Sequence, residues 1–174
     1  MSGSTSSRAH QPPAATGPRL TRDLVRQAVA RNSFAVLTHV TPAGAPRSSG
    51  VVYTVADDRM FVVVANDSWK ARHITRDGRV SVTVPVRRGG LLSLLFPIPP
   101  ATISFPAEAT VHPGMSLPDS PALAKLAALV PAERRSESTL IEMRPTGDYV
   151  TYGIGVSLLK MRDTKQSRAR VPVA

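Results

Sequence analysis

The stretch FAVLTHVTPAGAPRSSGVVYTVADDRMFVVVA, residues 34–65, decides the fold. Three β-branched, apolar segments in it are separated by two short turns. The first turn, Thr41–Pro46, has Pro and Gly at positions typical of turns, and the second is ADDR, residues 56–59. Two successive hairpins of this kind predict an antiparallel meander.

The sequence before the meander predicts a helix. Leu24, Val25, Ala28 and Val29 share one helical face, and Thr21 can cap the helix start. Beyond the meander, a second helix is predicted in SPALAKLAALV, with Ser as N-cap and Pro at the first helical position. These helices are short, so they flank the strands rather than forming a layer of their own.

Further strands are predicted in three places downstream. They are RVSVTVPV (79–86), ATISFPAEATV (101–111) and a last hairpin around PTGD (145–148). Pro106 predicts an edge or a bulge in the middle of its strand. A sheet of this size avoids exposed edges by closing, so we expect a mainly β (α+β) fold, a six-stranded antiparallel barrel with short flanking helices.

The ends of the chain differ in composition from its middle. Residues 1–17 are rich in Ser, Pro, Ala and Gly, and we expect a disordered leader. The barrel domain is expected over residues 18–159, and a basic, flexible tail over 160–174. The insert GLLSLLFPIPP (90–100) is apolar but too short to span a bilayer, so a dimer surface or pocket wall is expected there, without stable membrane insertion. The start has no apolar signal region, which favours a cytoplasmic protein.

The positive charge of the chain lies mostly in its ends. The net charge is +10, of which residues 1–32 and 160–174 contribute +4 each, leaving +2 for residues 33–159. A near-neutral barrel with 5% aromatic residues is a poor candidate for specific nucleic-acid binding. A basic nucleic-acid-binding barrel remains a rival hypothesis because basic ends bind polyanions without specificity.

Most familiar catalytic patterns are missing. The chain has no cysteine, and no nucleophile elbow, P-loop or Rossmann glycine motif is present. The four histidines, His10, His39, His73 and His112, lack metal-ligand spacing, so we expect no metal site. Asp57 and Asp58 lie in a predicted hairpin turn, where Asp tolerates the left-handed backbone.

The segment NDSWKARHITRDGRV, residues 66–80, predicts an anion site. Asp67 or Ser68 can cap a short helix whose first N–H groups attract anions. Lys70 lies in the first turn, where a cation is unfavourable unless an anion offsets it or its side chain simply points to water. Arg47 and Ser48 begin the second strand on the same rim, and we expect them to converge with Ser68 and Lys70 on one phosphate.

In order and content, residues 20–155 resemble the pyridoxamine 5′-phosphate oxidase-like family, the split β-barrel flavin and deazaflavin oxidoreductases. The family text S-x-K-x-x-N-L-x-x-D-P-R-V-S-L is matched by Ser68-Trp69-Lys70, then His73-Ile74, then DGRVSV, residues 77–82. TISFPAEATV is similar to the family's fifth strand. The resemblance implies a split barrel, a homodimer, and FMN or coenzyme F420 in a groove at the subunit interface.

The resemblance also implies which residues hold the cofactor. The strand beside the ring and its phosphate would be Arg47–Val52, and Ser68 and Lys70 would hold the phosphate. A polar contact to the ring is expected near Thr102. The full set implied or suggested is Arg47, Ser48, Ser49, Gly50, Val51, Val52, Ser68, Trp69, Lys70 and Thr102. No catalytic side chain is expected, because the cofactor performs the hydride transfer.

Two departures from the family narrow the activity. Trp69 stands where the oxidase itself has Arg, and the C-terminal VSLLKMRDTKQSRARVPVA lacks its substrate-binding motif, so vitamin B6 oxidation is not expected. The leading hypothesis is an FMN- or F420-dependent oxidoreductase acting on a small conjugated or quinone-like substrate. The alternative is a non-enzymatic flavin- or haem-binding module, which for haem would need His39 or His73 as ligand.

Overall fold

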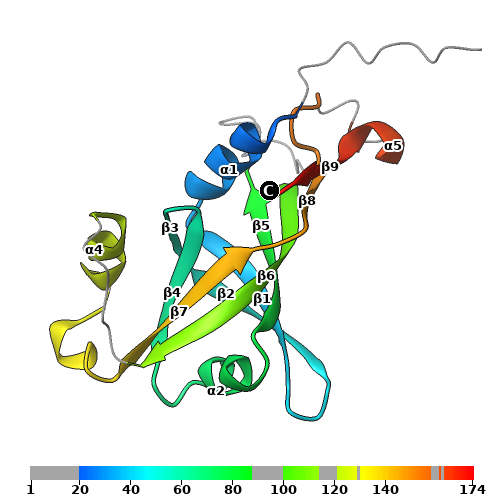
Figure 1. Ribbon diagram of the computed structural model, residues 1–174. Coiled ribbons are helices and arrows are strands. Elements are labelled where there is room, and N and C mark those ends of the chain that lie inside the picture. The colour runs from blue at the N-terminus through cyan, green and yellow to red at the C-terminus, as the bar shows by residue number, and fades with distance from the viewer. Residues whose placement is uncertain (1–19, 88–99, 114–120, 129, 158–160, 162) are drawn as a thin grey trace, which may run out of the picture.

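The computed structural model describes residues 20–87, 100–113, 121–128, 130–157, 161 and 163–174 (Figure 1). The expected leader, the Ser120 cap and nearly all of the apolar insert 90–100 lie outside these residues.

One antiparallel sheet dominates the described chain. Its main strands run in the order β2-β1-β5-β6-β7-β4-β3, and β8 pairs with both β6 and β9. The ends of this order, β2 and β3, are separated in sequence only by Tyr53, so the sheet curls into a barrel (Figure 1). The strands are β1 Phe34–Val40, β2 Pro46–Val52, β3 Thr54–Ala56, β4 Arg59–Ala65, β5 Arg79–Val86, β6 Ala101–Pro113, β7 Ser138–Pro145, β8 Asp148–Tyr152 and β9 Arg168–Pro172.

The expected count of six strands is too low, because nine occur in the described residues. One reason is a break at Tyr53, where the predicted second strand divides into β2 and β3. The Tyr53 N–H donates to Ser33 O at 2.8 Å, and its buried hydroxyl donates to Val29 O at 2.6 Å. The first bond extends the β1–β2 pairing by one residue, and from Thr54 onward the chain pairs with β4 as β3.

The other reason lies in the tail, where a flexible segment was expected. Thr164–Ser167 form the short helix α5, and β9 pairs along the whole of β8. Val171 is buried, while Arg168 and Arg170 are exposed. The basic residues therefore alternate with small and apolar ones, as in a strand with one covered face.

The expectation for Pro106 also needs correction. β6 is an interior strand, and Pro106 pairs with Ser81 of β5 within it. On its other side the strand changes partner, from β8 up to Ser104 to β7 from Ala107. The missing N–H of proline falls in this gap, and its carbonyl accepts from Thr146 N at 2.9 Å.

Short helices cover parts of the barrel. The helix α1 follows the prediction in its cap and in part of its face: Thr21 Oγ1 accepts from Leu24 N at 3.3 Å and Val25 and Val29 are buried, but Leu24 is 48% exposed. Asp57 and Asp58 have φ of 47° and 60°, which confirms their turn. The helices are α1 Arg22–Ala30, α2 Trp69–Arg76, α4 Pro121–Ala128, the 3₁₀ turn η1 Ala132–Arg134 and α5.

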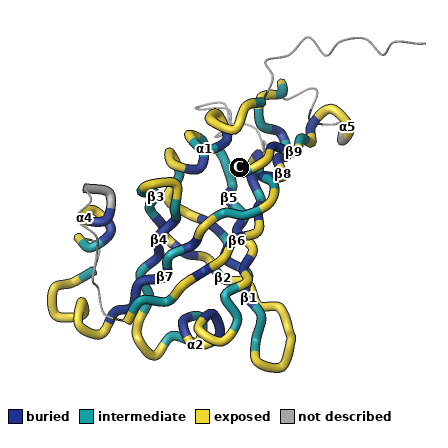
Figure 2. The backbone as a smooth tube through the Cα atoms, in the orientation of Figure 1, coloured by how far each residue is buried: buried dark blue, intermediate teal, exposed yellow. Residues whose placement is uncertain are grey.

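The core occupies the inside of the barrel, where Figure 2 shows the buried segments. Leu37, Ile103 and Phe105 are almost completely buried there, and Phe105 meets Tyr149 edge-on at 5.1 Å. A second, smaller cluster joins Leu123 and Leu126 of α4 to strands β4 and β7 through Phe61 and Leu140. This cluster holds α4 beside β4.

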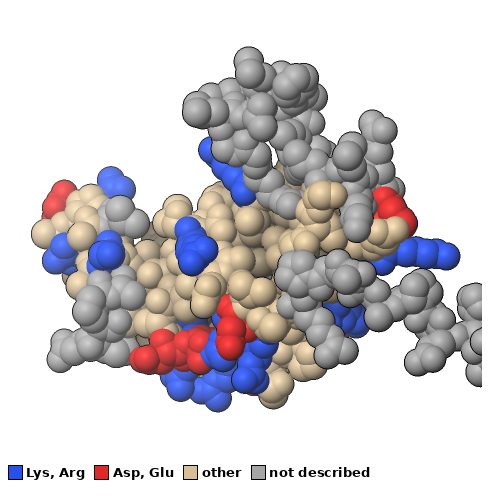
Figure 3. All heavy atoms as spheres, turned by 90° about the horizontal axis from the view of Figure 1, so that it is seen from above, with Lys and Arg blue, Asp and Glu red and all other residues tan. Residues whose placement is uncertain are grey.

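Surface charges are distributed in several groups. On the face in Figure 3, basic side chains occur at separate places and partly beside acidic ones. Arg59 binds Glu142 at 2.8 Å and Arg79 binds Asp77 at 2.7 Å. The Arg79–Asp77 pair is on the surface, where such a pair contributes about 0–1 kcal/mol and does little to stabilise the barrel, whereas the side chain of Glu142 is only 18% exposed. No helix in the described ranges has the length and apolar character needed to cross a membrane.

Candidate functional site

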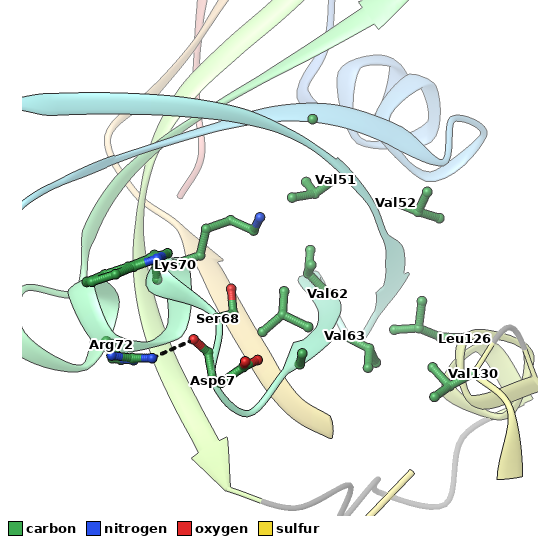
Figure 4. A pocket seen from close by; sticks show the side chains of 14 residues that line it. Val51, Val52, Val62, Val63, Asp67, Ser68, Lys70, Arg72, Leu126 and Val130 are labelled. Atoms are coloured by element: carbon green, nitrogen blue, oxygen red, sulfur yellow. Dashed lines mark hydrogen bonds between the residues drawn. The ribbon is translucent and has the colours of Figure 1, made fainter. Parts of the chain in front are cut away.

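A groove of about 920 Å³ lies between the start of α2, strands β2 and β4, and α4. Figure 4 shows Lys70 extending from α2 into this space, with Leu126 and Val130 on the far side. One end of the groove is polar and the rest is apolar. Its lining residues are Gly50, Val51, Val52, Val62, Val63, Val64, Ala65, Asp67, Ser68, Trp69, Lys70, Arg72, Leu126 and Val130.

The polar end is built by the turn from β4 into α2. Asn66 N donates to Glu137 O at 2.8 Å, and Thr139 Oγ1 donates to Asn66 Oδ1 at 2.6 Å, so β7 holds this turn in place. Ser68 is the N-cap, and within the described residues its hydroxyl makes no capping bond to the helix. The first N–H groups of an α-helix have no partner inside it, so an anion near Ser68 can use them.

The charge of this end is positive overall. Lys70 and Arg72 line it together with one acid, Asp67. Arg72 donates to the backbone oxygen of Asp67 at 2.9 Å, and its guanidinium lies 4.7 Å from the centre of the Trp69 ring. Arg72 therefore holds the exposed Trp69 by a cation–π contact. Lys70 is therefore the cation directed into the groove (Figure 4).

The apolar wall is formed by valines of the two strands β2 and β4. Val51 and Val62 are buried, while Val52 keeps 52% of its surface exposed. Leu126 of α4 lines the side of the groove opposite this wall, although it is more than fifty residues away in sequence from the lining residues of β2, β4 and α2. A flat apolar group could lie against this wall with an anionic group at the α2 end.

Six of the ten predicted site residues line the groove: Gly50, Val51, Val52, Ser68, Trp69 and Lys70. Arg47 instead lines a neighbouring cavity of about 530 Å³, which shares Trp69 with the groove. Ser48 Oγ lies 2.7 Å from Thr38 Oγ1, and the buried Ser49 Oγ has no partner among the described residues. Thr102 lies in β6 opposite Pro85 and Tyr152, and it is absent from the groove lining.

Sequence reasoning missed a pair of buried histidines beside this site. His39 Nε2 lies 3.0 Å from His73 Nδ1, and the two side chains are 4% and 8% exposed. Burial lowers the pKa of His39 below its ordinary value, and the neighbouring His73 lowers it further. The cations Lys70 and Arg47 act in the same direction.

A signal for this pair was present in the strand pattern. Ala35, Leu37 and His39 alternate along β1, and all three are buried. The partner of His73 is 34 residues away in sequence, so the segment around His73 does not reveal it by itself. Among the described residues, no group of three or more His, Cys, Asp or Glu side chains is arranged to hold a metal ion.

Comparisons with known proteins identify the fold. No family model matches the sequence, and no curated protein matches it significantly. Solved structures do match. A haem-binding protein from Mycobacterium smegmatis matches with a TM-score of 0.59 and 16% identity over 94% of this chain and 60% of that one. A putative pyridoxamine 5′-phosphate oxidase from Listeria innocua matches with a TM-score of 0.55 and 14% identity over 71% of this chain and 92% of that one. An F420 reductase matches with a TM-score of 0.52 and 18% identity over 70% of this chain and 92% of that one. This chain has the fold of the pyridoxamine 5′-phosphate oxidase-like split-barrel proteins.

The expected resemblance is thus confirmed at the level of the fold. The solved split barrels named above include both a haem-binding protein and an F420 reductase, so the split barrel by itself does not select a ligand. The choice depends on the lining of the groove in this chain.

Proposed function

We propose that this split barrel is a flavin- or deazaflavin-dependent oxidoreductase that binds FMN or coenzyme F420 in the groove between α2, β2 and β4. The observation that supports this most is the division of one groove into a cationic end and an apolar wall. Both cofactors combine an anionic phosphate with a flat conjugated ring, and such a groove offers a matching surface to each part.

The phosphate would lie at the start of α2. Lys70 supplies a positive charge there, Ser68 a hydroxyl donor, and the first turn its free N–H groups together with the helix dipole. This arrangement also explains why a lysine occupies the first turn of a helix, where acids are usual. The proposed clamp is smaller than expected from the sequence, because Arg47 lines a different cavity.

The ring would lie against the valines of β2 and β4, with Leu126 on the other side. These side chains exclude water from the ring and orient it by contact. The bound cofactor supplies hydride transfer, so the chain itself need only position a small conjugated or quinone-like substrate beside it. No acid or base from the chain is required by this proposal.

Haem is the second candidate ligand, and the groove lining argues against it. No histidine is found among the described residues that line the groove. A haem would have to use His73 from the neighbouring cavity, where one ring nitrogen already faces His39 at 3.0 Å. An absorption spectrum of the purified protein separates the candidates, since a Soret band would contradict the flavin proposal.

We also propose that the protein is a homodimer with the groove at or near the interface. Two large apolar side chains beside the groove support this: Phe34 and Val52 are cross-strand neighbours, and about half of each is exposed. β2 lies at the end of the strand order, and no strand of the described residues pairs with its outer edge, so a second copy could pair or pack there.

Replacing Lys70 tests the proposed phosphate site. Lys70→Ala should weaken FMN or F420 binding by about 10- to 100-fold, since a charge-assisted hydrogen bond contributes about 1.5–3 kcal/mol. Lys165→Ala is the matched control, because it removes the same charge from the exposed helix α5 at the other end of the molecule (Figure 1).

The affinity is measured by titration of flavin or deazaflavin fluorescence, and mass spectrometry of the ligand released from native-source protein identifies the cofactor. Equal affinities for the Lys70 variant and the wild type would contradict the assignment of this groove.

A further inference from the structure

The cavity beside the groove has a polar lining that the proposed cofactor site does not use. It measures about 530 Å³ and is lined by Thr41, Ala45, Arg47, Trp69 and His73. Trp69 divides it from the groove and is held in place by Arg72. Beneath it, His73 is in contact with the buried His39. The cavity therefore combines an exposed cation with a histidine pair that is more than nine-tenths buried.

The hydrogen positions of the pair follow from burial. A bond between two neutral imidazoles needs one N–H and one lone pair. His39 Nδ1 is fully buried with no partner in the described part of the chain. If His73 donated, His39 Nδ1 would carry an orphaned N–H, and buried N–H groups without an acceptor are rare. If His39 donates from Nε2, its Nδ1 is a bare lone pair, which is the less costly state.

This tautomer determines what the cavity presents. His73 accepts at Nδ1 and must then carry its hydrogen on Nε2, which has no hydrogen-bond partner among the described residues. The lowered pKa of His39 is consistent with a neutral His39 near pH 7. The cavity thus offers an N–H donor from His73 beside the guanidinium of Arg47.

The other polar groups in and near the cavity do not alter its excess of hydrogen-bond donors and positive charge. Thr41 Oγ1 is already used as an acceptor by Ala45 N at 3.1 Å. Among the described residues, none that lines this cavity is acidic. The acid lining the adjoining cavity of about 300 Å³, Asp77, is bound by Arg79 at 2.7 Å. A ligand here must therefore accept hydrogen bonds and is favoured if it is negative.

We propose that this cavity is an anion subsite, separate from the cofactor groove, that binds the carboxylate of a small molecule. Arg47 attracts and pairs with the carboxylate, and His73 Nε2–H donates to it. His39 is a positioning residue that fixes the tautomer of His73. The proposal does not depend on which cofactor the groove binds. Since the cavity and the groove share Trp69, a carboxylate bound here lies at the edge of whatever occupies the groove.

The tautomer can be read directly in the wild-type protein. Long-range ¹H–¹⁵N spectra with ¹⁵N-histidine should show His73 protonated at Nε2 and His39 also at Nε2. Benzoate, added as a carboxylate probe, should shift the His73 signals, while the uncharged benzamide should not. His73 protonated at Nδ1, or equal responses to benzoate and benzamide, would overturn the proposal.

A variant tests the charge. Arg47→Gln should weaken benzoate binding at least tenfold by calorimetry, whereas Arg22→Gln on α1 should leave it unchanged. Both side chains are exposed, so neither variant threatens the fold. Unchanged benzoate affinity in the Arg47 variant would refute the role of Arg47. The benzoate and flavin titrations report on different cavities, so a negative result in one leaves the other standing.

Discussion

Gly78 links α2 to β5, and its replacement gives a sharp test of how α2 is held on the barrel. A Cβ added at Gly78 would lie 2.6 Å from the backbone oxygen of Ala109 in β6, whereas an ordinary contact begins at 3.4 Å. The backbones cannot separate freely, because Ala109 N donates to Gly78 O at 2.7 Å across the same contact. Gly78→Ala must therefore either strain β6 or break this hydrogen bond.

The expected cost follows from these two alternatives. Overpacking of this kind costs about 1–3 kcal/mol, and loss of the hydrogen bond costs about 1 kcal/mol. We expect Gly78→Ala to lower the free energy of unfolding by about 2 kcal/mol, which for a chain of this size lowers Tm by about 4–8 °C. The measurement is urea unfolding followed by far-UV circular dichroism, since the exposed Trp69 is a poor fluorescence probe.

Gly44→Ala is the informative comparison. Gly44 has a φ of +80° and no atom within 4 Å of an added Cβ, so alanine there is strained in its backbone but collides with nothing. At Gly78 the backbone has no positive φ, so alanine there is unfavourable because of the collision with Ala109 and not because of backbone strain. If Gly78→Ala unfolded at the wild-type urea concentration, the close approach of α2–β5 to β6 would not constrain the barrel as described.

Two further predictions concern pH and assembly. The pKa of His39 is lowered in the folded state, so the unfolded chain binds more protons below pH 6.5. The free energy of unfolding should therefore fall with falling pH, by at most about 1.4 kcal/mol per pH unit from this group. His39→Gln should reduce this slope between pH 7 and 5, and an unchanged slope would mean that other groups cause the pH dependence. The proposed dimer should scatter light with a mass near twice 18.6 kDa, and Phe34→Asp should shift it to the monomer; a wild-type monomer would contradict the dimer.

Much of the fold could be predicted locally. The two hairpins of residues 34–65 and helix α1 follow from periodicity and turn residues, because each is stabilised by neighbours close in sequence, whereas the break at Tyr53 between the hairpins was not predicted. The same holds for the polar end of the groove, where the short segment Ser68 to Lys70 combines a cap and a cation. Gly50 to Val52, which the resemblance implied, line the same groove, and their role in binding a cofactor stays a prediction.

The tertiary structure decided what depends on distant partners. It placed His39 on His73 and brought Leu126 of α4 to the groove wall. It also divided Arg47 from Lys70 by the side chain of Trp69. Periodicity tells which face of a strand is covered, but not which residue covers it, because that choice is made by packing between segments that the sequence separates. For this reason local sequence patterns predicted an antiparallel barrel and a cation beside a helix start, whereas the meeting of two cavities at Trp69 depends on packing between distant segments.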